Sequence, residues 1–163
     1  MSLDGYIAGP KGEADWIPMD PEVNFVEIWS RFDILLMGRR TYETAREGFE
    51  KFGTQGNKIA VVSRTLRAED HPGLKILSEL GPESVADLRG KAKKDIWLFG
   101  GGELFRSLLG MGEVDRVEVS VVPVLLGQGL QLLPGQGART RLKLVEHKVY
   151  RSGRIRLQYE IQK

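Results

Sequence analysis

The sequence contains no cysteine, and its 163 residues include only two histidines. The absence of cysteine excludes disulfide bonds, thiolate metal sites and a cysteine nucleophile. The histidines, His71 and His147, have no Asp, Glu or His partners at ligand spacing, so we expect no metal site. A chain without disulfides fits a reducing compartment, and we therefore expect a cytoplasmic protein.

Long hydrophobic runs and an excess of one charge are also missing. The longest apolar stretches, residues 34–37 and 117–126, are too short or too interrupted to span a bilayer. The 24 basic and 22 acidic residues leave a formal net charge of +2, which is too small to recruit nucleic acid or an anionic membrane. We expect a soluble protein that binds a small-molecule substrate, with no nucleic-acid or membrane partner and with any anion site confined to a local group of residues.

Short apolar runs alternate with helix-compatible segments. The runs at residues 33–38, 58–63 and 95–100 are typical of strands that are buried on both faces. The helix-compatible segments are residues 21–32, 41–47, 82–91 and 103–109. The first of these helices is expected to have Asp20 as its N-cap and Pro21 at its first position. This alternation predicts an α/β fold with mostly parallel strands.

In the last third of the chain, apolar and polar residues alternate. Residues 116–122, 141–150 and 155–161 follow this pattern, and residues 151–154 are suited to a hairpin turn. We therefore expect antiparallel strands at one edge of the sheet. No linker or repeat divides the chain, so the sequence predicts a single domain over residues 1–163, with a mixed sheet and helices on both faces.

Three strand ends carry residues suited to binding phosphate. They are Gly38-Arg39-Arg40-Thr41, Ser63-Arg64 and Gly100-Gly101-Gly102-Glu103. The carboxyl ends of parallel strands meet at one edge of a sheet, so we expect these segments to share a ligand. Glycines allow close backbone approach to a pyrophosphate, and guanidinium groups bind phosphate oxygens in pairs. The alternative is that the glycines only form a tight turn and the arginines pair with surface acids such as Glu43 or Glu47.

Four motifs occur in the order in which they occur in the dihydrofolate reductase superfamily. They are Ser2-Leu3-Asp4-Gly5-Tyr6-Ile7-Ala8, Gly38-Arg39-Arg40-Thr41-Tyr42-Glu43, Val62-Ser63-Arg64 and Phe99-Gly100-Gly101-Gly102-Glu103-Leu104. The chain most resembles the reductase domain of riboflavin biosynthesis and its stand-alone bacterial relatives, in which Trp-Ile, here Trp16-Ile17, follows the first motif. The resemblance implies a mixed sheet of about eight strands, NADPH as the cofactor and a homodimer.

The resemblance also implies roles for residues at the motif positions. Ile7 and Ala8 would line the nicotinamide, whereas phosphate and adenosine would be held by Gly38, Arg39, Arg40 and Thr41. The adenosine side would be contacted by Ser63 and Arg64. The pyrophosphate would be wrapped by Gly100, Gly101, Gly102, Glu103 and Leu104, with a cis peptide between the first two glycines.

On the substrate side, the resemblance points to Ser2, Asp4, Trp16 and Gly127 as contacts. Glu22 falls where dihydrofolate reductases carry the acid that helps to protonate their substrate, and Asp4 is a second candidate catalytic group. Each has an ordinary alternative. An acid in a first helical turn stabilises the helix dipole, an Asp before Gly5 is typical of turns, and the loop around Gly127 also fits a plain strand connection.

Two features depart from the family pattern. Only Met1 precedes the first motif, where relatives have a full apolar strand, so we expect the first strand to be truncated. The zinc deaminase that accompanies the reductase in bifunctional riboflavin enzymes has no counterpart, because its cysteine ligands are missing. The sequence predicts an NADPH-dependent reductase of a small heterocyclic or sugar-linked substrate. The alternatives are dihydrofolate reductase activity and a catalytically silent NADP-binding dimeric module.

Overall fold

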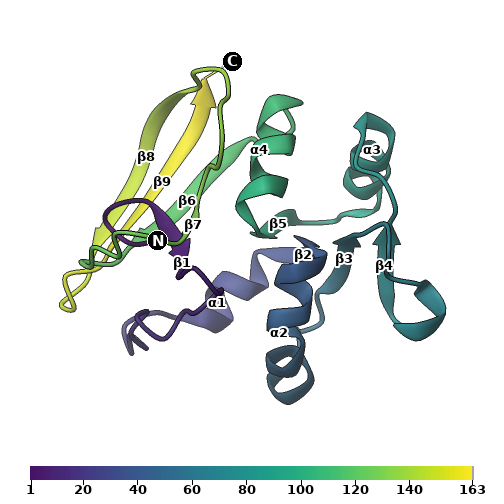
Figure 1. The fold of residues 1–163 in the computed structure, drawn as a ribbon, viewed down its shortest axis with the longest axis horizontal. Coiled ribbons are helices and arrows are strands. Elements are labelled where there is room, and N and C mark those ends of the chain that lie inside the picture. Colours follow the sequence, from purple (N-terminus) through teal and green to yellow (C-terminus); the bar gives the residue numbers. More distant parts are fainter. Residues whose placement is uncertain (163) are drawn as a thin grey trace. The chain divides into compact units, whose positions relative to one another are not determined.

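A computed structural model describes residues 1–162, which form nine strands, four α-helices and one short 3₁₀-helix (Figure 1). These elements group into two compact units. The central unit is Asn24–Leu104, and the terminal unit is Met1–Val23 together with the chain from Phe105 onward. The single domain expected over the whole chain stays a prediction. None of the helices in residues 1–162 combines the length and the hydropathy that a membrane crossing requires.

The central unit is built on a four-stranded parallel sheet in the order β4-β3-β2-β5. Its strands are β2 (Phe32–Gly38), β3 (Lys58–Val62), β4 (Leu74–Leu77) and β5 (Asp95–Gly100). The three apolar runs are confirmed as the strands β2, β3 and β5; the expected burial holds for most of β2 and β3, whereas β5 is half-buried. The edge strand β4 was not expected, because Lys75 interrupts its short apolar sequence; this lysine forms an ion pair with Asp87.

The helices are α1 (Phe25–Ser30), α2 (Arg39–Phe52), α3 (Pro82–Lys91) and α4 (Gly102–Gly110), and the 3₁₀-helix is η1 (Ala68–Asp70). The helix α2 connects β2 to β3, whereas α3 connects β4 to β5, so the two crossovers run in opposite directions across the sheet (Figure 1). Crossovers between parallel strands are right-handed, and α2 and α3 therefore cover opposite faces, as the sequence predicts.

One face of the parallel sheet holds the main apolar cluster of the central unit. Its buried members are Leu35, Met37, Tyr42, Ile59 and Val61. Aromatic rings of α1, α2 and β5 pack against this cluster in mostly edge-on or tilted contacts: Trp29, Phe49, Trp97 and Phe99. Dense packing of this kind fixes the ends of β2, β3 and β5, which are the points where the candidate phosphate-binding residues begin.

The start of the first helix differs from the sequence-based expectation. The helix α1 begins at Phe25, and its N-cap is Asn24, whose side chain accepts a hydrogen bond from Glu27 N at 3.1 Å. The expected cap, Asp20, instead accepts from Glu22 N at 3.0 Å and from the Ser152 hydroxyl at 2.6 Å. An Asp side chain that bonds two residues ahead favours a turn over a helix, which explains the later start.

In the terminal unit, β6 (Arg116–Val121), β8 (Arg141–Val149) and β9 (Ile155–Gln162) form an antiparallel sheet in the order β6-β9-β8. The hairpin turn expected at residues 151–154 joins β8 to β9, and Tyr150 N donates to Arg154 O at 2.9 Å across it. The alternation of apolar and polar residues therefore identified these three strands correctly.

Two very short strands, β1 (Tyr6–Ala8) and β7 (Leu130–Gln131), form a separate antiparallel pair. Ahead of β1, Ser2 makes an isolated parallel bridge to Val122, and Gly5 turns the chain with a φ of 89°. This turn separates the bridge from β1. The strands of residues 1–162 consequently lie in three sheets of four, three and two strands, where the sequence predicted one mixed sheet.

Candidate functional site

The three phosphate-binding segments predicted from the sequence follow neighbouring strands of the central sheet. In the parallel register, Gly38 at the end of β2 pairs with Val62 at the end of β3. On the other side of β2, Met37 pairs with Gly100 at the end of β5. The residues that follow these positions therefore emerge at the same edge of the sheet, and this part of the prediction is confirmed.

The triple-glycine bend after β5 packs against the first turn of α2. A Cβ atom built on Gly101 would lie 3.4 Å from Thr41 Oγ1, and one built on Gly100 would lie 3.5 Å from Thr41 Cγ2. Gly100 has a φ of 141°, a conformation that favours glycine, and its peptide bond to Gly101 is cis, as the resemblance implies. Thr41 thus sits directly beside the bend that leads into α4.

The arginines at this edge differ in whether they have an acidic partner. Arg39 Nη1 lies 3.1 Å from Glu43 Oε1 one turn along α2, so the alternative interpretation, a surface ion pair, holds for Arg39. Arg40 and Arg64 are exposed and form no ion pair with any other residue in 1–162. Two guanidinium groups next to the glycine-rich strand ends therefore keep their donors available for an anion.

Ser63 is buried, and its hydroxyl already supports the turn after β3. Its Oγ accepts hydrogen bonds from Thr65 N at 3.2 Å and from Leu66 N at 3.0 Å. A hydroxyl oxygen has two acceptor lone pairs, so both are occupied; only its hydrogen is left to donate, and Thr65 Oγ1, 3.4 Å from Ser63 Oγ, is also within reach of it. The side chain is consequently suited to donate to a phosphate oxygen and not to accept from an adenine or ribose N–H or O–H.

In the terminal unit, Asp4 anchors the segment around Gly127. Its carboxylate accepts from Leu126 N at 3.1 Å and from Gly127 N at 2.8 Å. The hydrogen bonds from Ser2 and from Gly127 and Leu126 lower the pKa of the Asp4 carboxyl below its ordinary value. Asp4 is therefore ionised at neutral pH, which suits a hydrogen-bond acceptor and does not suit a proton donor.

Ser2, expected to contact substrate, has no exposed surface. Its Oγ accepts from Tyr6 N at 2.9 Å and lies 3.3 Å from Tyr6 O. These bonds, together with the effect of Ser2 on Asp4, give the side chain the task of shaping the turn that presents the carboxylate.

Ile7 and Ala8, the residues expected at the nicotinamide, belong to β1 and are half-buried. Gly129 holds the neighbouring strand against them: a Cβ atom on Gly129 would lie 2.2 Å from Ala8 O. In the Gly127-Gln128-Gly129 segment, Gly127 was predicted as a site residue and Gly129 was not. The repeated glycine was the available signal, but only the pairing of β1 with β7 shows which of the two permits the close approach.

Glu22 is exposed and lies in a turn ahead of α1, so it does not occupy the first helical turn that the sequence suggested for it. Its Oε2 accepts from Arg151 N at 3.0 Å, and its Oε1 lies 3.6 Å from Arg151 Nε. Together with the Asp20–Ser152 bond, this contact ties the segment before α1 to the β8–β9 turn. Trp16, earlier in the same segment, is half-buried and donates from Nε1 to Glu13 O at 3.2 Å.

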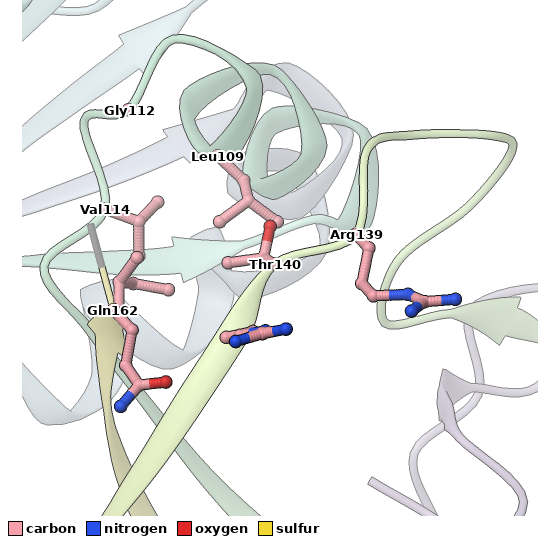
Figure 2. A pocket seen from close by; sticks show the side chains of 8 residues that line it. Leu109, Gly112, Val114, Arg139, Thr140 and Gln162 are labelled. Atoms are coloured by element: carbon pink, nitrogen blue, oxygen red, sulfur yellow. The ribbon is translucent and has the colours of Figure 1, made fainter.

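One surface hollow of the terminal unit lies away from the predicted residues. It is an open hollow of about 610 Å³ near the end of α4, and Figure 2 shows Leu109, Val114, Thr140 and Gln162 on its wall. A second hollow of about 220 Å³ lies between Glu22 and Arg151. The candidate site is therefore defined by strand ends and turns, and not by either hollow.

In the parallel sheet, β5 leads into a triple-glycine bend, and the neighbouring strand β2 leads into a helix that begins Arg-Arg-Thr. These features define a dihydrofolate reductase-like α/β protein. A sequence model of the RibD C-terminal domain matches residues 1–155. The chain belongs to this family.

Relatives and solved structures agree with this assignment. The uncharacterized protein YyaP of Bacillus subtilis strain 168 is 31% identical over 172 residues, covering 98% of this chain and 90% of its own length. A crystal structure of a protein assigned to riboflavin biosynthesis from Shewanella sp. PV-4 has a TM-score of 0.84 at 25% identity, covering 100% of this chain and 96% of its own.

A third comparison concerns a bifunctional enzyme. The deaminase/5-amino-6-(5-phosphoribosylamino)uracil reductase of Thermotoga maritima has a TM-score of 0.75 at 18% identity. The match covers 99% of this chain and 54% of that enzyme. At this identity the likeness shows the fold alone, and this chain is similar to about half of the larger protein.

Proposed function

We propose that the chain is an NADPH-dependent reductase that transfers hydride to a small heterocyclic or sugar-linked substrate. The observation that carries the proposal is the meeting of three features at one edge of the central sheet: the triple-glycine bend, the start of α2, and the turn after β3. Membership of the RibD C-terminal domain family supports the same chemistry, because a structural relative carries a uracil-derivative reductase activity in its name.

The residues at this edge fit a phosphorylated dinucleotide. The helices α2, of 14 residues, and α4, of nine, both begin here, and helix N-termini stabilise phosphate with free N–H groups and a positive dipole end. Gly100 and Gly101 carry no side chain, so at this edge the backbone of the bend packs directly against Thr41 at the start of α2. Arg40 and Arg64 provide unpaired charge for the 2′-phosphate that distinguishes NADPH from NADH.

When bound, NADPH supplies the hydride. The residues of this chain bind and orient: Arg40 and Arg64 neutralise phosphate charge, Ser63 donates its hydroxyl hydrogen, and Thr41 supports the glycine bend. We propose Ile7 and Ala8 as the nicotinamide contacts, and Trp16 and the Gly127 segment as substrate contacts, as the family resemblance implies. Asp4 holds the Gly127 segment and accepts a hydrogen bond from substrate.

We propose that water delivers the proton. The lowered pKa of Asp4 leaves it ionised, and the carboxylate of Glu22 is exposed and engaged with Arg151. These two observations also favour a second candidate function, a catalytically silent NADP-binding module. The two functions are separated by following NADPH absorbance with 5-amino-6-(5-phosphoribosylamino)uracil and, in parallel, with dihydrofolate. Turnover of either substrate excludes the silent module.

Cofactor binding is tested by titrating the protein with NADPH and NADH and following cofactor fluorescence. Charge-assisted hydrogen bonds contribute about 1.5–3 kcal/mol, so we expect Arg40→Ala and Arg64→Ala each to weaken NADPH binding by roughly 10- to 100-fold. NADH has no 2′-phosphate. Whichever of these two arginines contacts that phosphate, its replacement should therefore leave NADH binding unchanged. Arg46→Ala is the matched control, because Arg46 lies on the same helix and pairs with Glu50. Equal affinity of the wild-type chain for NADPH and NADH contradicts the proposal.

A further inference from the structure

The hollow near the end of α4 has an apolar wall. Its volume of about 610 Å³ falls within the range of about 300–1,000 Å³ that is usual for small-molecule sites. The wall consists of Leu109 of α4, Val114 of the connection that follows, and Ile161 of β9, and all three side chains are half-buried. Figure 2 shows Leu109 and Val114 on neighbouring sides of the hollow. The wall therefore offers aliphatic surface against which part of a ligand can be removed from water.

The rim of the same hollow is basic. It consists of Arg139, Thr140, Arg141 and Gln162. Both arginines are exposed and form no ion pair with any other residue in 1–162, and within the same range the Thr140 hydroxyl has no hydrogen-bond partner. In Figure 2, this hydroxyl points toward Leu109, whereas Arg139 extends outward from the rim. Two guanidinium groups and a hydroxyl are therefore available to an anion.

Acidic side chains do not neutralise this rim. None of the eight lining residues is acidic. Glu113 and Asp115 flank Val114 in the sequence, but neither lines the hollow, and each already makes an interaction of its own within the chain. In the strand register Arg141 lies beside Gln162 of β9, which is neutral. The rim consequently keeps its positive charge.

The next residue of β9 on the face of Gln162 is an acid, Glu160. It also lies outside the lining of the hollow. In the sheet it has a basic neighbour on each side, Arg116 of β6 and Lys143 of β8. Opposite charges that face each other across strands attract, so these two neighbours compensate the carboxylate of Glu160.

Hydrogen bonds hold the backbone on two sides of the hollow. Ahead of the rim, Arg106 of α4 donates from Nη1 to Gln136 O at 3.2 Å, and a Cβ atom on Gly135 would lie 2.8 Å from the same nitrogen. On the other side, Ile161 N donates to Asp115 O at 3.1 Å and joins the end of β9 to the connection after α4. Contacts within the terminal unit thus shape the hollow in advance, which lowers the cost of ordering it around a ligand.

We propose that this hollow binds a small anion that carries an aliphatic chain. The charged group lies at Arg141 and Arg139, and the chain lies along the apolar wall. Carboxylate and phosphate both fit, because a guanidinium group binds either one with two parallel hydrogen bonds. No lining residue is aromatic, so a nucleobase would lack the ring on which bases usually stack. The proposal is independent of the proposed function, since the lining includes none of the cofactor or substrate residues.

Isothermal titration calorimetry with hexanoate and hexyl phosphate tests the ligand class, with acetate and hexanol as matched controls. Each CH₂ group buried against the wall should tighten binding by roughly three- to fourfold, so hexanoate should bind at least about tenfold more tightly than acetate. Hexanol lacks the charge and should bind more weakly than hexanoate. The tighter of hexanoate and hexyl phosphate identifies the preferred anion. Binding of neither at millimolar concentration overturns the proposal, as does equal binding of hexanoate and acetate, or of hexanoate and hexanol.

Substitutions at the rim test the location. Arg141→Gln should weaken hexanoate binding roughly tenfold, because it removes a charge-assisted contact, and Arg139→Gln should weaken it less, because that side chain extends outward. Arg151→Gln is the matched control: it makes the same charge change in the turn at the other end of β8, outside the lining. Equal losses in Arg141→Gln and Arg151→Gln would reduce the effect to net charge and overturn the proposal.

A further variant separates this site from the proposed cofactor site, which also attracts anions. Arg40→Ala should leave hexanoate binding unchanged, and a loss of binding in this variant overturns the proposal. A chain that binds hexanoate at Arg141 but does not bind NADPH supports this site while contradicting the proposed function. Thermal unfolding of each variant confirms that it is folded.

Discussion

The central and terminal units hold their candidate site residues by different physical means. In the central unit, these residues follow the largely buried strands β2 and β3, with Leu35 and Met37 at 0% exposure, and the half-buried strand β5. In the terminal unit, Asp4 and Gly129 act through hydrogen bonds and one close backbone contact, and the strand β8 is exposed along its whole length. Burial fixes the first set, whereas turn geometry fixes the second.

Because of this difference, the candidate site residues of the two units should respond to different substitutions. A packed strand end tolerates loss of a surface charge without moving, so the arginines of the central unit can be replaced singly to measure binding. A turn held by a carboxylate depends on the ionisation of that group and on the conformation of single glycines. Three predictions test this contrast, beginning with the largest effect.

The largest expected effect is in the central core. Leu35→Ala removes a side chain that is fully buried and should lower the free energy of unfolding by about 3 kcal/mol, through lost transfer free energy and the cavity that remains. Leu144→Ala removes the same atoms from a side chain that is 48% exposed and should cost less than about 1 kcal/mol in the monomer. Urea titrations at concentrations where the chain is monomeric give both values. Equal costs would remove the contrast between the units.

The next effect is expected at the contact between β1 and β7. In Gly129→Ala the new methyl group would lie 2.2 Å from Ala8 O, on a residue whose φ is 153°. The strands must separate or distort, and we expect a loss of about 2–3 kcal/mol in unfolding free energy. The matched control is Gly137→Ala, because a Cβ atom there has no neighbour within 4 Å. A neutral Gly129→Ala variant would show that the β1–β7 pair can open without cost.

The sequence predicted the central unit better than the terminal one, for reasons that the residues make clear. Continuous apolar runs such as residues 33–38 identify strands buried on both faces, and glycine with arginine after them marks the strand ends. The four-residue strand β4 and the two short strands β1 and β7 gave no such signal, because so few residues have no measurable periodicity.

At the level of single residues, the sequence left choices that only the fold resolves. Asp20 and Asn24 are equally good helix caps, and the hydrogen bond from Ser152, distant in sequence, decides between them. The pairing of Arg39 with Glu43 at a spacing of four was visible in the sequence as an alternative, whereas the availability of Arg40 required the structure. Gly129 likewise needed the register of β1 with β7.

The smallest predicted effect concerns the pH dependence of the turn that Asp4 holds. The hydrogen bond from Ser2, followed by those from Gly127 and Leu126, lowers the pKa of Asp4 in the folded chain below its ordinary value of 3.8. A lowered folded pKa means that the stabilisation is present above pH 3.8 and is lost as the pH falls from there through the folded value. Asp4→Asn removes this titration, so the unfolding free energy of the variant lacks the pH dependence that Asp4 contributes to the wild-type chain.

We therefore expect the difference in unfolding free energy between the wild-type chain and Asp4→Asn to be constant from neutral pH to about pH 5 and to shrink toward pH 3. Asp20 and Asp87 also have lowered pKa values, but they titrate in both proteins and cancel in the difference. Urea titrations at each pH measure it. A difference that stays constant down to pH 3 would mean that the Asp4 carboxylate gains nothing from Ser2 and Gly127, and the terminal unit would then depend on backbone geometry alone.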